Sequence, residues 1–224
     1  MSNQNLLIGY TGFIGSNLKE HFKFLSNSKT KFNQNLVYDD VFISAPSGIK
    51  YKCNQNPNQD LENIKNLIYE LKNLKCKRVV LISSSDCFYL KDSYGKNRFY
   101  LEEQLKEIFK EKLFIFRLAM VFGKNAIKGL AFDFKNKNFN FYKQGIFQFY
   151  PVKRLYNDIQ DLVKKNIHFA YLSSEGIDVD EILKLFGRRR VEPNKTIYDL
   201  KEVNYKFISK EEIFNNLKEY WSAN

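Results

Sequence analysis

Apolar residues in this chain occur as short continuous runs that alternate with stretches of helical periodicity. The continuous runs predict buried strands at 6–9, 40–45, 78–83, 113–118 and 167–172. The periodic stretches predict helices at 14–24, 59–74, 94–111, 156–165, 179–186 and 210–221. Because strands and helices alternate, the pattern predicts an α/β fold with a parallel, doubly wound sheet.

The pattern changes after residue 124, where aromatic residues crowd together. Phenylalanine and tyrosine alternate with polar residues around Gly145, which predicts a hairpin-like pair of strands. Interleaved with lysines, these aromatics could stack nucleic-acid bases, but we favour the buried face of a small sheet. The sequence therefore predicts two parts: residues 1–124, completed by the strand at 167–172, and a small mixed C-terminal lobe at 125–224.

Composition excludes several classes of protein. Of 224 residues, 44% are hydrophobic and 27% charged, so the chain can bury a core. No run approaches the ~18–20 apolar residues of a membrane span, and the polar start does not resemble a signal peptide. Three cysteines without a Cys-x-x-Cys pair, and only two histidines, argue against a metal site, a disulfide framework or a Ser-His-Asp triad. These features favour a reduced, cytoplasmic protein.

The net charge of +11 has two possible explanations. It could indicate a polyanionic partner, either a nucleic acid or a phosphorylated substrate. It could also reflect lysines spread over the whole surface, because the only block of basic residues is at 188–190. We favour the second explanation and expect neither a nucleic acid nor a membrane as partner.

A glycine-rich motif links the first strand to the first helix. Gly9, Gly12 and Gly15 form G-x-x-G-x-x-G, in which they allow a tight turn, a close phosphate and close helix packing. The helix start at Phe13 and Ile14 would offer free N–H groups to the phosphates. The first part of the chain is therefore predicted to be a Rossmann-like dinucleotide-binding domain. No acid stands at 27–35, where Lys29 and Lys31 occur instead, so the cofactor is NADP or NAD with a slight preference for NADP.

A second motif carries acid–base chemistry. Ser84 ends the strand at 78–83, and Tyr94 and Arg98 stand four residues apart, on one face of a helix. A nearby cation is expected to lower the pKa of the tyrosine, which could then exchange a proton during carbonyl–alcohol chemistry beside a nicotinamide. In an alternative interpretation, Arg98 forms only an exposed salt bridge with Glu102.

These motifs, in this order, resemble the extended short-chain dehydrogenases/reductases, which include nucleotide-sugar epimerases, dehydratases and reductases. The similar segments are G-Y-T-G-F-I-G-S-N-L, L-I-S-S-S-D-C-F, Y-G-K-N-R-F-Y-L-E, R-L-A-M-V-F-G and L-Y-N-D-I. The resemblance implies a nucleotide-sugar substrate, catalytic roles for Ser84, Tyr94 and Arg98, and cofactor contacts that include Arg98 and Ala45. Arg98 stands where the family has lysine, and Phe88 where it usually has tyrosine. Arginine keeps the charge but does not readily release a proton.

Three further residues are weaker candidates for the functional site. Asp86, Arg154 and Arg189 are possible substrate contacts, although a turn or a solvated loop would also explain them. The departures from the family pattern leave a second function open, a non-catalytic NAD(P)-binding sensor or scaffold. The family resemblance also implies a homodimer through the helices at 59–74 and 94–111.

Overall fold

The computed structural model describes residues 4–138, 144–187, 195–197 and 208–223. The chain divides into two compact units. The first comprises Met1–Arg117 with Tyr156–Ala170, and the second comprises Leu118–Leu155 with Tyr171–Asn224.

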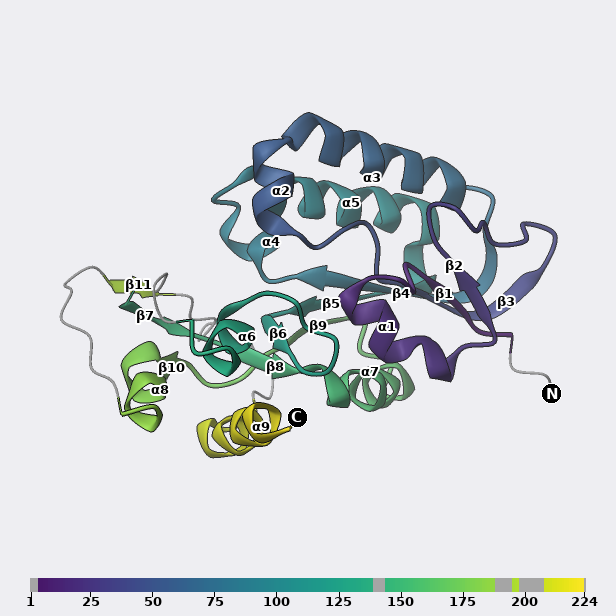
Figure 1. The fold of residues 1–224 in the computed structure, drawn as a ribbon. Helices are drawn as coiled ribbons and strands as arrows, with labels where there is room; N and C mark the ends of the chain where they lie inside the picture. The colour runs from purple at the N-terminus through teal and green to yellow at the C-terminus, as the bar shows by residue number, and fades with distance from the viewer. Residues whose placement is uncertain (1–3, 139–143, 188–194, 198–207, 224) are drawn as a thin grey trace. The chain divides into compact units, whose positions relative to one another are not determined.

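A six-stranded sheet forms the centre of the first unit (Figure 1). Its order is β2-β1-β3-β4-β5-β9, and β1 pairs in parallel with β2 and β3, as β3 does with β4. The strands are β1 (Leu6–Ile8), β2 (Phe24–Ser26), β3 (Val37–Ile43), β4 (Lys75–Ser84), β5 (Leu113–Leu118) and β9 (Phe169–Leu172). The predicted α/β fold with a parallel sheet is confirmed.

The chain reverses its direction of travel across the sheet at β1. From β1 it passes to β2 on one side, then returns past β1 to β3 on the other, and continues outward to β4. Such a reversal is a topological switch point, and ligands of open α/β sheets bind outside the carboxyl ends of the strands that flank it. The fold thus directs attention to the residues that follow β1 and β3.

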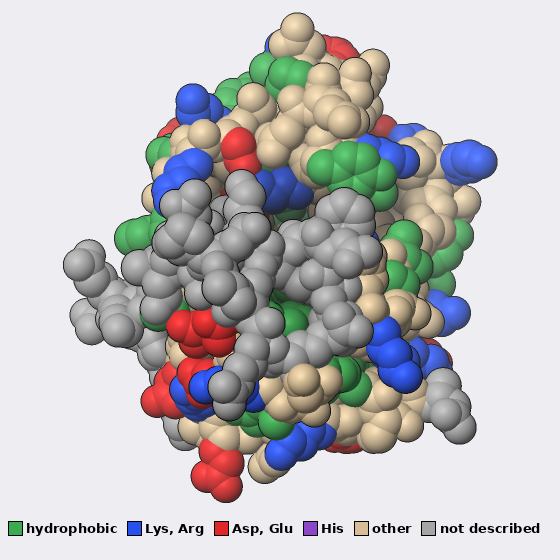
Figure 2. Space-filling model, turned by 60° about the vertical axis from the view of Figure 1, so that its left-hand side comes forward, with side chains coloured by type: hydrophobic (Ala, Val, Ile, Leu, Met, Phe, Trp, Pro, Cys, Tyr) green, Lys and Arg blue, Asp and Glu red, His purple; other side chains and the backbone are tan. Residues whose placement is uncertain are grey.

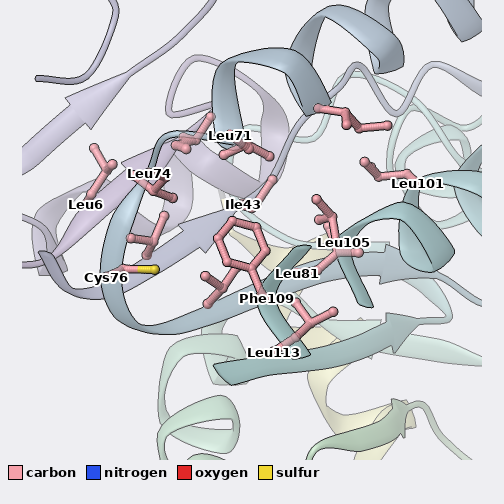
Figure 3. Close-up of a cluster of buried hydrophobic side chains, with 14 of the residues drawn as sticks. Leu6, Ile43, Leu71, Leu74, Cys76, Leu81, Leu101, Leu105, Phe109 and Leu113 are labelled. Atoms are coloured by element: carbon pink, nitrogen blue, oxygen red, sulfur yellow. The ribbon is translucent and has the colours of Figure 1, made fainter. Parts of the chain in front are cut away.

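Helices cover both faces of this sheet (Figure 1). Side chains alternate along a strand, so Leu6 and Ile8 face one side and Leu7 faces the other. Leu6 packs in a buried cluster with Leu71 of α3 and Leu105 of α5 (Figure 3). Ile8 belongs to the same cluster. On the opposite face, the ring of Phe42 contacts those of Phe22 and Tyr156. The helices of this unit are α1 (Phe13–Leu18), α2 (Lys50–Gln55), α3 (Pro57–Leu71), α4 (Asp86–Tyr89), α5 (Ser93–Phe109) and most of α7 (Leu155–Lys164).

The helix predicted at 14–24 is wrong at its C-terminal end. The helix α1 stops at Leu18, one 3-10 turn follows at Lys19–His21, and the chain then enters β2. Phe24 and Leu25 lie opposite Leu6 and Leu7 in a parallel register. Pairing with β1 outweighs the helical periodicity, because without β2 the backbone N–H and C=O groups on that edge of the fully buried strand β1 would lack partners.

In the second unit, Gly145 lies within a strand and not at the turn of the predicted hairpin, whose first arm at 139–143 is outside the described residues. The strand β7 (Gln144–Phe147) pairs with β10 (Ile177–Asp178) and β11 (Lys195–Ile197), whereas β8 (Phe149–Pro151) pairs in parallel with β6 (Met120–Phe122). Between β7 and β8 stands Gln148, a buried residue whose side-chain amide donates to the carbonyl of Ser174. The neighbouring strands therefore belong to different sheets. The other elements are α6 (Leu130–Lys135), α8 (Val179–Leu185) and α9 (Lys210–Ser222).

The aromatic residues of this segment are largely core residues. Phe134, Phe149 and Tyr150 are buried, and residues 139–143 of the predicted alternation lie outside the described residues.

On the face shown in Figure 2, Lys and Arg side chains are scattered among acidic, polar and apolar ones. Among the described residues, no helix is both long and apolar enough to cross a bilayer.

Candidate active site

The glycine motif forms a tight turn between β1 and α1. Gly9 has φ +89°, and a Cβ there would lie 2.7 Å from the carbonyl oxygen of Ser44, at the end of β3. A Cβ on Gly15 would lie 2.2 Å from the carbonyl oxygen of Gly9. Both positions therefore require glycine for packing within the protein itself.

Gly12 differs from the other two glycines. A Cβ at this position would meet only the carbonyl oxygen of Gly9, at an ordinary 3.5 Å. It is exposed and is the N-cap of α1, so the first-turn N–H groups of Phe13 and Ile14 follow it directly. No internal packing demands glycine here, and its missing side chain leaves room for a ligand group beside the helix start. This turn fits the pyrophosphate of a dinucleotide.

The loop after β2 carries no carboxylate. The side-chain oxygen of Asn27 accepts hydrogen bonds from the N–H groups of Lys29 and Thr30, and so closes the turn. Lys31 pairs with Glu70, and Lys29 is exposed. Of the two lysines that suggested a phosphate site, one is thus engaged with an acidic side chain.

Ser84 and Tyr94 come together in the structure. The Ser84 hydroxyl is near enough to Tyr94 to act on its pKa, and Tyr94 is 9% exposed. The N–H of Tyr94 also donates to the side chain of Asn54. At the following residue, a Cβ on Gly95 would lie 2.5 Å from the carbonyl oxygen of Asp86, so α5 packs directly against the turn that follows β4.

The pKa of Tyr94 moves in the direction opposite to the prediction. Burial raises the pKa of Tyr94 and the charge of Asp86 adds to the increase, and together they outweigh the lowering by the Arg98 charge and the nearby Ser84 hydroxyl. The cation is present, since the Cζ of Arg98 lies 4.5 Å from the centre of the Tyr94 ring. The predicted lowered pKa was wrong because the sequence does not report the extent of burial.

Arg98 has a partner that the sequence analysis missed. Its guanidinium donates to both carboxylate oxygens of Asp60, at 2.9 and 3.1 Å, and to the carbonyl of Ser47 at 2.8 Å. The side chain of Asn97 also donates to Asp60. The exposed Arg98–Glu102 salt bridge considered above is wrong, because both residues are buried and paired elsewhere. A sequence signal existed, since Asp60 lies in the apolar stripe that includes Ile64 and Ile68.

Glu102 instead pairs with Arg117, and the pair holds the end of β4. The carboxylate of Glu102 is fully buried and accepts from Arg117 and from the hydroxyl of Ser83. Ser83 directly precedes Ser84. Two charged residues of the family-like motifs thus meet in space and fix the backbone that presents Ser84.

Lys50 is a further residue that the sequence analysis did not single out. Its Nζ lies 2.5 Å from Asp86 and 3.0 Å from Asp92. The hydroxyl of Ser84 donates to the other oxygen of Asp86 at 3.2 Å. Asp92 accepts from the N–H of Gly95 and caps α5. Asp86 is therefore part of a polar network beside Ser84.

The remaining sequence candidates have the following positions. Ala45 is partly buried against the core just after β3, and Phe88 is 45% exposed on α4. Arg154, in the second unit, pairs with Glu212 of α9, and Arg189 lies outside the described residues. The three cysteines are free and buried. In the described ranges, no cluster of His, Cys, Asp or Glu could hold a metal ion.

Comparison with solved structures supports the fold. The UDP-N-acetylglucosamine 4-epimerase of Methanobrevibacter ruminantium M1, in complex with UDP-N-acetylmuramic acid, matches with a TM-score of 0.70 and 15% identity, over 98% of this chain and 97% of that one. The dTDP-4-dehydrorhamnose reductase of Bacillus anthracis str. Ames, in complex with NADP, matches with a TM-score of 0.68 and 13% identity, over 99% of both chains.

A third structure, UDP-glucuronic acid 4-epimerase from Bacillus cereus in complex with NAD, matches with a TM-score of 0.67 and 15% identity, over 97% of this chain and 95% of that one. No protein-family model and no curated protein matches the sequence. At these identities the likeness establishes the fold alone, which is the fold that the resemblance in the motifs implies.

Proposed function

We propose that this chain is an NAD(P)-dependent epimerase, dehydratase or reductase that acts on a nucleotide-linked sugar. The observation that carries this proposal is the buried Tyr94, whose ring centre lies 4.5 Å from the Cζ of Arg98 and whose helix packs against the segment that follows Ser84, in the unit that also contains the glycine turn. A buried tyrosine next to a serine hydroxyl suits proton exchange with a carbonyl or alcohol oxygen. The fold shared with nucleotide-sugar epimerases and reductases supports the substrate class.

Each residue has a distinct role in this proposal. Tyr94 transfers the proton of the sugar oxygen, and Ser84 orients that oxygen. Arg98 lies against the Tyr94 ring and favours the phenolate electrostatically. When bound, the nicotinamide supplies the hydride chemistry. Because Asp60 and Ser47 engage its guanidinium, we give Arg98 a mainly electrostatic role and only a secondary ribose contact.

We assign cofactor binding to the first unit, at Gly9, Gly12, Phe13, Ile14, Gly15 and Ala45. The second unit is then the substrate lobe, where Arg154 and Arg189 are possible contacts.

NADP is the preferred cofactor, because Asn27 follows β2 directly and no carboxylate stands there to repel a 2′-phosphate. The three buried, free cysteines suit a cytoplasmic location.

A homodimer through α3 and α5 is part of the proposal. Tyr69 on α3 is 75% exposed and Tyr100 on α5 is 36% exposed, and tyrosine is enriched at interfaces. Light scattering of the purified protein would test the mass of the assembly, and a monomer at all concentrations would contradict the dimer.

The main experiment is turnover of purified protein over a panel of UDP-, dTDP- and GDP-linked sugars with NADP and NAD. The matched variant is Tyr94→Phe, which removes one hydroxyl and keeps the ring. We expect turnover of at least one sugar by the wild type and its loss in Tyr94→Phe.

The second candidate is a non-catalytic dinucleotide-binding sensor or scaffold. The engagement of Arg98 by Asp60 and the raised pKa of Tyr94 favour it. Dinucleotide binding without turnover of any sugar, and unchanged behaviour of Tyr94→Phe, would support this candidate over the enzyme.

A further inference from the structure

Gly48, in the segment between β3 and α2, lies opposite the hydroxyl group of Tyr94. A Cβ built on Gly48 would stand 3.8 Å from the Oη of Tyr94, an ordinary van der Waals distance. Among the described residues, and apart from the chain neighbours of Gly48, no other atom comes within 4 Å of that Cβ position. The missing side chain of Gly48 therefore leaves a space that borders the Tyr94 hydroxyl.

Neither the backbone nor the packing of this segment requires glycine at position 48. The φ of Gly48 is not positive, so other residues can adopt its conformation. At Gly9 and Gly15, by contrast, a Cβ would overlap a backbone carbonyl. Gly48 is exposed, whereas the Tyr94 side chain is buried. The space at Gly48 therefore leads from the surface of the first unit to the hydroxyl of a buried tyrosine.

The segment that carries Gly48 is held in place from α5. The guanidinium of Arg98 donates to the carbonyl oxygen of Ser47 at 2.8 Å, and Asp60 accepts from the same guanidinium at 2.9 and 3.1 Å. The Cζ of Arg98 also lies 4.5 Å from the centre of the Tyr94 ring. Because one buried side chain contacts both the ring and the residue before Gly48, it fixes the separation of Gly48 from the hydroxyl.

This space has the dimensions that proton exchange with a substrate requires. An oxygen that is hydrogen-bonded to Tyr94 lies about 2.7 Å from the Oη, and the carbon that carries this oxygen lies roughly 3.5 Å from it. A Cβ at position 48 would stand at a similar distance from the Oη, 3.8 Å. A side chain at position 48 and a substrate carbon would therefore compete for room beside the hydroxyl.

We propose that Gly48 is a specificity-determining residue, because its missing side chain opens the path by which a substrate group reaches the Tyr94 hydroxyl. The size of this opening limits which carbon and substituents can lie beside Tyr94, as the walls of a substrate pocket do in other enzymes. The inference rests on the proposed function, since it concerns the group that exchanges a proton with Tyr94.

Two variants of increasing size at position 48 test the inference on any sugar that the panel identifies. Gly48→Ala should lower kcat/KM roughly 10–10²-fold, on the order of the loss caused by a misplacement of about 1 Å, and Gly48→Val should lower it further. Thermal unfolding should show Gly48→Ala to be as stable as the wild type, because its Cβ meets no atom closer than 3.8 Å. Lys52→Ala, at an exposed position on α2, is the control and should keep kcat/KM. An unchanged kcat/KM in Gly48→Val would overturn the inference.

Acetylation of tyrosine side chains provides a measurement that does not depend on turnover. N-acetylimidazole acetylates accessible phenol oxygens, and peptide mass spectrometry compares Tyr94 with Tyr69, which is 75% exposed and serves as the internal reference. We expect acetylation of Tyr94 in the wild type and several-fold slower acetylation in Gly48→Val, with Tyr69 unchanged. Equal rates for Tyr94 in the two proteins, or no acetylation of Tyr94 in either, would contradict the proposed path. If no sugar is turned over, the proposed function fails, and acetylation still decides whether Gly48 controls access to the hydroxyl.

Discussion

Arg98 and Asp60 form a buried ion pair in which both carboxylate oxygens accept from the guanidinium. Each residue is only 5% exposed, and they link α5 to α3. Removal of one partner would leave the other charge buried without compensation. The pair is therefore a structural requirement of the segment that carries Tyr94.

The first prediction concerns this pair. Asp60→Ala should lower the free energy of unfolding by about 3–5 kcal/mol, since the Arg98 charge would stay buried. The matched control is Glu103→Ala, which removes an exposed pair with Lys106 and should cost no more than about 0.5 kcal/mol. Urea denaturation measures both. Equal losses in the two variants would contradict the importance of burial.

A second prediction distinguishes the roles of Gly12 and Gly15 in stability and in dinucleotide binding. Gly15→Ala should destabilise the protein by roughly 1–3 kcal/mol, because its Cβ overlaps the carbonyl of Gly9. Gly12→Ala has room for its Cβ and should lose at most about 1 kcal/mol, because alanine is a poorer N-cap than glycine, while weakening dinucleotide binding. Thermal unfolding and calorimetric titration with NADP give the two readouts. Undiminished NADP binding by Gly12→Ala would argue against a phosphate at this turn.

Glu102 and Arg117 allow a double-mutant cycle. Each single replacement, Glu102→Leu or Arg117→Met, should cost about 3–5 kcal/mol, because it leaves a buried charge unpaired. The double variant should lose much less than the sum, since no charge remains. Urea denaturation of all four proteins provides the test, and strictly additive losses would show that the two residues do not interact.

The interactions of Asp92 predict how the free energy of unfolding changes at acidic pH. Burial acts to raise its pKa, but hydrogen bonds from Gly95 and Lys50 outweigh burial and lower it in the folded protein. A lowered folded pKa adds stability above the ordinary aspartate value of about 3.9, and this stability is lost as pH falls through the folded pKa. Asp92→Asn, which can still cap the helix, should be less stable than wild type at pH 7. The difference should shrink as pH falls below about 4, and a constant difference in unfolding free energy would contradict this.

The cysteines should be unreactive in the native protein. Burial raises the pKa of Cys53 and Cys76 to about 11 and that of Cys87 to about 12, and the thiolate is the reactive form. At pH 8, mass spectrometry should find no iodoacetamide adduct before unfolding and three adducts in urea. Rapid native labelling of Cys53 would indicate that the segment around α2 opens.

Much of the site follows from local pattern. The glycine spacing predicted a turn that the structure places at the carboxyl end of β1, and the segments that carry Ser84 and Tyr94 pack together where Gly95 meets the backbone of Asp86. Such local features can be predicted from the sequence because periodicity and glycine spacing record burial and backbone conformation within one or two elements.

The sequence alone determined the alternation of the main strands and helices of the first unit and the glycine turn, and it gave the pairing of Ser84 with Tyr94 as a hypothesis. Only the tertiary structure decided which charges meet. Arg98 pairs with Asp60, 38 residues earlier in the chain, and not with Glu102, one helical turn further along α5. The helix predicted at 14–24 ends early, and the chain forms β2 in its place. Local pattern shows which positions are buried, but the partner of a buried charge depends on which distant segments the fold brings together, because each such charge must be compensated where it lies.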